Sequence, residues 1–261
     1  MKVDVKINGL KALMNEMSDL EKKQLPFAMA KTLTKTAQQI KEAAVKEMSR
    51  TLDRPTPYTL GSLYIKTAKK KELTAMVYFK DKSSAGKGNP AANFLFPQVE
   101  GGQRNLKRFE SSLRRIGVLP KGLFVVPGNA CPLDAHGNIP SSLIVQILSY
   151  FQAFGEQGYR ANITDKRKKS IARGSKKQGF GFEYFVSYGP GTWSGRQHLP
   201  AGIYKRVKFS VGTSIKPIMM FTKETKYKKR FPFYEVAQKT LDQNLIGNFN
   251  EAMDEAVKTA K

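Results

Sequence analysis

The sequence predicts an α+β protein in which a mixed or antiparallel sheet is packed by long N-terminal and C-terminal helices. Apolar residues recur at helical spacing over two long segments, residues 26–49 and 233–259. Shorter runs between these segments are rich in aromatic and β-branched residues, which is typical of strands. Because the expected helices and strands do not alternate regularly, the pattern does not favour a parallel βαβ sheet.

Residues 1–155 are expected to form an N-terminal α+β part. Alternating apolar residues predict a strand over 3–7, and apolar residues at helical spacing predict an amphipathic helix over 10–23. Pro26 suits the first turn of the long helix that follows. The prolines of residues 54–57 force an extended segment, so this helix should end before them.

The middle of the chain is expected to hold shorter elements joined by polar connections. Residues 81–92 have the composition of a loop. The expected strands and short helices are strands over 60–65, 73–79 and 123–126 and helices over 106–116 and 140–151.

Residues 156–180 are expected to form a basic flexible arm or loop. From Lys166 to Lys177, seven of twelve residues are Lys or Arg and none is acidic. Residues 181–261 should then complete the same domain. They are expected to form strands over 182–187, 202–211 and 215–221 and a last helix over 233–259.

Net charge is the most unusual property of the sequence. Forty-five Lys and Arg residues face twenty-one Asp and Glu residues, giving a formal net charge of +24 at pH 7. Such a surplus favours polyanionic partners, which could be nucleic acid, an acidic protein surface or an anionic membrane surface. The sequence shows neither an apolar leader nor an apolar run of the roughly 20 residues that a spanning helix needs, so no membrane partner is expected.

No catalytic, metal-binding or cofactor-binding motif is found, so the chain is expected not to be an enzyme. The single cysteine, Cys131, excludes an intramolecular disulfide and suits a reducing compartment. Neither His136 nor His198 has a nucleophile in a recognisable motif nearby. A nuclease whose carboxylates show no known spacing stays as a weaker alternative.

Several short strings in a fixed order give the chain a family resemblance. They are Arg54-Pro55-Thr56-Pro57-Tyr58-Thr59-Leu60, Phe96-Pro97-Gln98-Val99-Glu100-Gly101-Gly102, Arg104 with Lys107 and Phe109-Glu110, Leu133-Asp134-Ala135 with Gly137-Asn138, Leu199-Pro200-Ala201-Gly202-Ile203-Tyr204, Lys216-Pro217, and Lys229-Arg230-Phe231-Pro232-Phe233. Taken together they resemble minor tail and tail-completion proteins of tailed bacteriophages, the group related to lambda minor tail protein Z and the head–tail joining proteins.

This resemblance implies a structural virion protein of the phage neck or tail, a ring subunit that joins or completes the tail at the head–tail interface. Its partners would be further copies of itself, portal-side connector proteins and tail proteins, after assembly in the host cytoplasm. No catalytic residue or cofactor comes with the family. Gly101 and Gly102 would allow a turn after a strand.

Candidate contacts to a neighbouring protein or a polyanion are cations of two basic segments, residues 166–177 and 226–230, and two isolated arginines. They are Lys166, Arg167, Lys168, Lys169, Arg173, Lys176, Lys177, Lys228, Lys229, Arg230, Arg54 and Arg206. The alternative function is a basic nucleic-acid-binding protein that contacts DNA phosphates without sequence specificity. Ordinary solvated side chains are the structural alternative for each of these residues.

Overall fold

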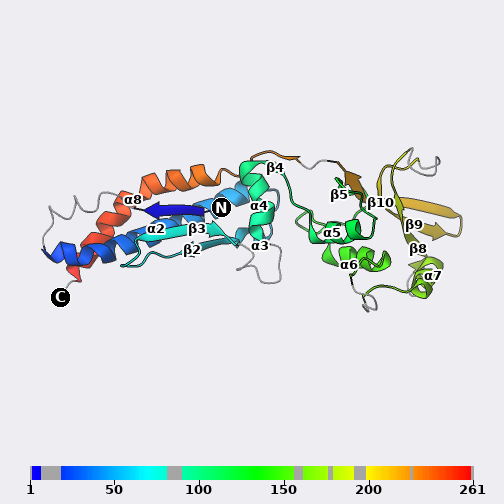
Figure 1. Cartoon of the computed structure of the whole chain (residues 1–261), viewed down its shortest axis with the longest axis horizontal. Helices are drawn as coiled ribbons and strands as arrows, with labels where there is room; N and C mark the ends of the chain where they lie inside the picture. Colours follow the sequence, from blue (N-terminus) through cyan, green and yellow to red (C-terminus); the bar gives the residue numbers. More distant parts are fainter. Residues whose placement is uncertain are drawn as a thin grey trace. The chain divides into compact units, whose positions relative to one another are not determined.

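The computed structural model describes residues 2–6, 19–80, 90–155, 161–175, 179–190, 198–223 and 226–259. Its antiparallel sheets and its long helices near both ends of the chain confirm the predicted α+β class (Figure 1). The chain separates into two compact units, each with its own core. Unit 1 holds residues 1–102 and 227–261, and unit 2 holds residues 103–226.

This division differs from the predicted one, in which residues 1–155, 156–180 and 181–261 belonged to a single domain. The last helix packs against the long helix near the N-terminus, whereas the strands between 182 and 222 pair with a strand at 124–127. Unit 2 is therefore an insertion within unit 1. The short strands β4 (Gly102–Gln103) and β11 (Lys226–Tyr227), which pair with each other, mark the two crossings of the chain.

Unit 1 contains a three-stranded antiparallel sheet in the order β1 (Lys2–Lys6), β3 (Thr74–Phe79), β2 (Leu63–Lys66). Alternation along β3 sends Ala75, Val77 and Phe79 into the core, as predicted for this strand. The opposite face carries Tyr64 and Tyr78, paired across β2 and β3 with their rings stacked 6.2 Å apart.

Two long helices pack together in unit 1, α2 (Asp19–Thr51) and α8 (Phe233–Lys258) (Figure 1). Between them, the buried amide of Asn248 donates to Thr36 Oγ1 at 3.0 Å and to Gln39 Oε1 at 2.7 Å. Ion pairs Lys31–Glu255 and Lys35–Glu251 join the same two helices at the surface.

Pro26 lies inside α2, not in its first turn as expected. Leu25 precedes it and Met29 follows it, and both pack with Ala252 and Ala256 of α8. Burial on both sides of the proline offsets the hydrogen bond that proline cannot make. Most of the helix predicted over 10–23 lies outside the described residues.

The loop predicted over 81–92 and onward is wrong from residue 91, where a helix begins, α4 (Ala91–Glu100). Residues 81–89 of that loop lie outside the described part of the chain. Ala91, Leu95 and Val99 recur every four residues and are buried in the core of unit 1, which holds the helix despite Pro97. Gly101 and Gly102, with φ of 78° and 96°, therefore follow a helix and not a strand.

Unit 2 is built on a four-stranded antiparallel sheet. Its order is β5 (Phe124–Pro127), β10 (Gly212–Thr222), β9 (Gly202–Phe209), β8 (Phe182–Ser187). The helices α5 (Arg108–Arg115) and α6 (Ser141–Tyr150) supply apolar residues to the core that this sheet shares. These elements confirm the strands and short helices expected here.

A buried ion pair lies within unit 2. The carboxylate of Glu110, at the start of α5, accepts two bonds from the Arg104 guanidinium, at 2.6 and 2.7 Å. It also accepts backbone N–H bonds from Val125 of β5 and from Lys107, both at 2.7 Å. Four bonds to one carboxylate tie α5, the preceding segment and the sheet together.

Candidate polyanion-binding surface

The basic segment predicted to be a flexible arm forms an ordered helix over most of its described length, α7 (Asp165–Arg173). Thr164 caps its N-terminus by accepting a hydrogen bond from the Arg167 N–H, and Asp165 lies in the first turn. Gly174 ends it with φ of 74°. These cap signals outweigh the basic composition that suggested a loop.

Close backbone approach fixes α7 onto the sheet. A Cβ atom at Gly181, just before β8, would lie 2.1 Å from the carbonyl oxygen of Ala172 in the last turn of α7. Only glycine permits this approach. After α7 the chain forms a short hairpin, in which Gly174 of β6 (Gly174–Ser175) pairs with Phe180 of β7 (Gly179–Phe180).

The cations of α7 divide between an inner and an outer face. The half-buried Lys168 lies over the ring of Tyr150, 5.6 Å from its centroid, and pairs with Asp165 at 3.4 Å. Lys166, Lys169 and Arg173 follow one another at helical spacing and are exposed. No described carboxylate pairs with any of these three side chains. This row of exposed cations is called the α7 stripe below.

The remaining predicted contact residues do not form a second such row. Lys228, Lys229 and Arg230 precede α8 in unit 1, where Lys229 pairs with Glu235 at 2.8 Å. That carboxylate raises the pKa of Lys229. Arg54 lies beside Asp53 with Nε–Oδ1 at 3.1 Å.

Arg206 of β9 is engaged on the sheet of unit 2. Its guanidinium pairs with Glu183 of β8 at 2.8 Å and lies over the ring of Phe185 at 4.6 Å. Lys176 and Lys177 lie outside the described residues. Of the predicted contact residues in the described part of the chain, the structure therefore gathers on the exposed side of one helix only Lys166, Lys169 and Arg173, with Arg167 exposed beside them.

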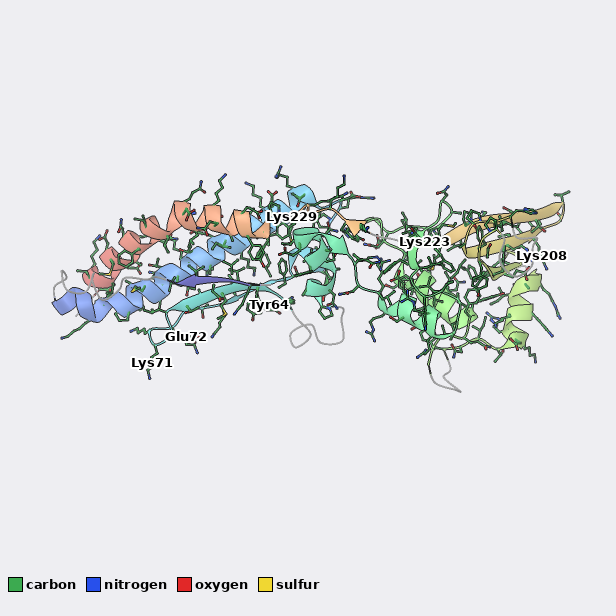
Figure 2. The ribbon with its side chains drawn as sticks, turned by 45° about the horizontal axis from the view of Figure 1, so that its top comes forward. Tyr64, Lys71, Glu72, Lys208, Lys223 and Lys229 are labelled. Carbon is green, nitrogen blue, oxygen red and sulfur yellow. The ribbon has the colours of Figure 1, made fainter. Side chains whose placement is uncertain are left out.

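Apart from Arg206, sequence reasoning missed the cations on and beside the strands β9 and β10 of unit 2. Lys205 of β9 lies opposite Lys216 of β10, with its ammonium 4.0 Å from the ring centroid of Phe182. Burial, and then the nearby Lys216, lower the pKa of Lys205. Lys208 of β9 and Lys223, the residue directly after β10, are exposed (Figure 2). The sequence signal that could have identified them was the presence of lysines among the apolar residues of the predicted strands.

Positive charge is concentrated in unit 2. Its sequence contains 21 Lys and Arg residues and six Asp and Glu residues. In the described residues from 161 to 223 the acids are Asp165 and Glu183, and both are ion-paired. A surface with this balance attracts anionic groups over about a Debye length, roughly 8 Å at physiological salt.

Two residues of the types considered for chemistry, Asp134 and Cys131, have structural contacts. Asp134 Oδ1 accepts the N–H groups of Asn138 at 2.8 Å and His136 at 2.9 Å, which closes a turn and lowers the pKa of Asp134. Cys131 is buried, and burial raises its thiol pKa. No group of three or more metal-ligating side chains gathers within the described ranges.

Within the described residues, no helix is both long enough and apolar enough to cross a membrane. In the comparisons with known proteins, no family model matched the chain, and neither a curated protein nor a solved structure was found to be similar to it.

Proposed function

We propose that this chain is a non-enzymatic assembly protein of a phage neck or tail. As a ring subunit, it would join or complete the tail at the head–tail interface and remain in the virion. The ordered strings that resemble tail-completion proteins support this setting. A ring of identical subunits needs two unlike faces on each copy, and two units of different charge balance supply such a difference.

The α7 stripe is the observation on which this proposal depends most. A disordered basic arm must lose conformational entropy when it binds, whereas a capped helix already holds its cations in place. Lys166, Lys169 and Arg173 therefore form a preorganised contact for an acidic neighbour. Preorganised charges at the rim of an interface mainly raise the association rate and fix how the two partners are placed against each other.

The second candidate function is direct contact with DNA, which the same stripe favours. Its exposed side chains are cations without an interleaved aromatic ring, so contacts would be made to phosphates and not to bases. DNA affinity would then fall steeply with salt.

The test compares two double charge reversals. Lys166→Glu with Lys169→Glu reverses the α7 stripe, and Lys46→Glu with Lys239→Glu makes the same change in net charge on exposed helix positions of unit 1. We expect the first variant to reduce the yield of joined, infectious particles by about tenfold or more, and the control to change it little.

The decisive measurements are mass spectrometry of purified virions and electron microscopy of heads and tails. Virions that lack the chain, or normal particle yield without it, would overturn the proposal. Duplex-DNA binding whose salt slope is reduced by the α7 reversal, together with normal particle joining, would favour the DNA-contact function instead.

A further inference from the structure

An exposed apolar tip lies at one end of the unit 2 sheet. Strands β9 and β10 are joined by the two residues Ser210 and Val211, and Val211 is 99% exposed. Phe209 ends β9 and is 39% exposed, and Phe180 of β7 is 58% exposed. The rings of Phe180 and Phe209 meet edge to face with centroids 4.8 Å apart. Phe180, Phe209 and Val211 are called the apolar tip below.

Folding of the single chain does not explain this composition. Two-residue hairpin connections favour Gly, Asn and Asp, because these residues adopt the required backbone angles at little cost. A β-branched valine at this place gains nothing from burial, since almost all of its surface stays in water. Apolar side chains clustered on a protruding hairpin are typical of a contact surface.

Two cations lie next to residues of the apolar tip along the chain or across a strand pair. Lys208 precedes Phe209 and is exposed near the end of the strands (Figure 2). Arg173 of the α7 stripe directly precedes Gly174, which pairs with Phe180. The two acids described between 161 and 223 are already neutralised by Lys168 and Arg206. An occupant of the tip must therefore be apolar at its centre and negative at its rim.

We propose that the apolar tip docks into an apolar pocket on an acidic surface of a partner protein. This inference rests on the proposed function, in which that partner is a neighbouring virion protein. At this contact a second copy of unit 2 would bring the same excess of cations, 21 against six acids, so charge disfavours it as the occupant of the tip. Nucleic acid gains little from an aliphatic valine, which offers no face for base stacking.

The rigidity of the tip favours a protein pocket over a lipid surface. The edge-to-face ring pair is held by β7 and β9, whose positions are fixed by the pairing of β6 with β7 and by the Lys208 N–H bond to the Gly181 carbonyl. A preorganised shape is rewarded by a complementary pocket, because less entropy is lost on binding. A fluid bilayer rewards apolar area, and three side chains offer little of it.

The test places a photo-crosslinking benzoylphenylalanine at Val211 in the full chain during particle assembly. The matched control carries the same group at Val145 on α6, an equally apolar position of the same unit that is 51% exposed. We expect one dominant adduct from position 211, to an acidic segment of a different protein, and no such adduct from position 145.

Binding of the captured protein is then measured with Val211→Asp and Val145→Asp. We expect Val211→Asp to weaken Kd by about tenfold or more and Val145→Asp by less than about twofold. Affinity should also fall as salt rises, because cations lie next to residues of the tip. Val211→Asp should leave the melting temperature unchanged, because the Val211 side chain is almost fully exposed in the folded chain.

Several outcomes would overturn the inference. They are an adduct to a second copy, to DNA or to lipid, equal adducts from both positions, no adduct, unchanged affinity of Val211→Asp, and tight binding to vesicles of phosphatidylglycerol and phosphatidylethanolamine that Val211→Asp abolishes. Capture of a host protein absent from virions would support the docking inference and contradict the proposed function. If virions contain the chain but no adduct forms at position 211, the proposed function is supported and the docking inference is contradicted.

Discussion

Replacing Glu110 by glutamine should destabilise unit 2 strongly and leave unit 1 nearly unchanged. Both side chains of the Arg104–Glu110 pair are almost fully buried, and the carboxylate accepts four hydrogen bonds. Glutamine keeps the shape but has one acceptor oxygen, and it leaves the Arg104 charge buried without a counter-ion. Breaking a buried pair in this way costs about 3–5 kcal/mol.

That loss is a large part of the 5–15 kcal/mol that typically stabilises a domain. For a unit of this size it should lower the melting temperature by roughly 10 °C or more. Hydrogen exchange followed by mass spectrometry resolves the two units. We expect exchange to accelerate in the amides of α5 and β5, while those of α2 and α8 keep their protection.

The control is Glu183→Gln, which breaks the partly exposed Arg206–Glu183 pair of the same unit. We expect it to cost about 1 kcal/mol or less, because water screens that pair. If Glu110→Gln is no more destabilising than this control, the reasoning about the buried pair is wrong. Equal loss of protection in α2 would refute the independence of the two units.

The same carboxylate predicts acid sensitivity. Burial alone raises the pKa of Glu110, but the bonds from Arg104, the Val125 N–H and the Lys107 N–H outweigh it, so the net shift is downward from 4.5. A lowered folded-state pKa means that this stabilisation is fully present above 4.5 and is lost as pH falls through the folded-state value. In that acidic range, the free energy of unfolding of unit 2 should therefore depend less on pH in Glu110→Gln than in the unmodified protein.

Three further predictions test other parts of the fold. Asn248→Ala should destabilise unit 1 by about 1–3 kcal/mol in urea unfolding, because buried partners on α2 lose their bonds; a loss confined to unit 2 would contradict it. Gly181→Ala should separate α7 from the sheet, since its Cβ would lie 2.1 Å from a carbonyl oxygen, and faster hydrogen exchange in α7 checks this. Replacing residues 103–226 by a two-residue turn should leave a folded unit 1, because the Cβ position of Gly101 is 3.4 Å from the Tyr227 carbonyl oxygen; loss of the helical circular dichroism of α2 and α8 would count against it.

Hydrophobic periodicity was sufficient for the elements with one buried face. Alternation along 73–79 and helical spacing over 233–259 both predicted elements that the structure contains, because burial of one face is what stabilises them. The same signal was present in α4, where Ala91, Leu95 and Val99 recur every four residues, but the loop composition of residues 81–92 and onward outweighed it in the prediction.

The two-unit division and the α7 surface could not be read from local patterns. The packing of both long helices on one sheet was expected, but the separate core of residues 103–226 depends on pairing between distant segments, such as that of β5 with β10. In α7 the cap residues Thr164 and Gly174 were visible, but the positive charge of the segment outweighed them in the prediction. The ammonium of Lys168 over the ring of Tyr150 shows how a cation of this segment can take part in the fold through a cation–π contact.

The inserted position of unit 2 explains why so much charge can be placed there. Excess positive charge destabilises a compact domain by self-repulsion, and a core that is stabilised separately confines this cost to one unit. Unit 1 keeps its helices paired by ion pairs such as Lys31–Glu255, while unit 2 carries the α7 stripe and the apolar tip. The chain therefore keeps its exposed cationic and apolar contact groups in a unit whose core is separate from that of the paired long helices.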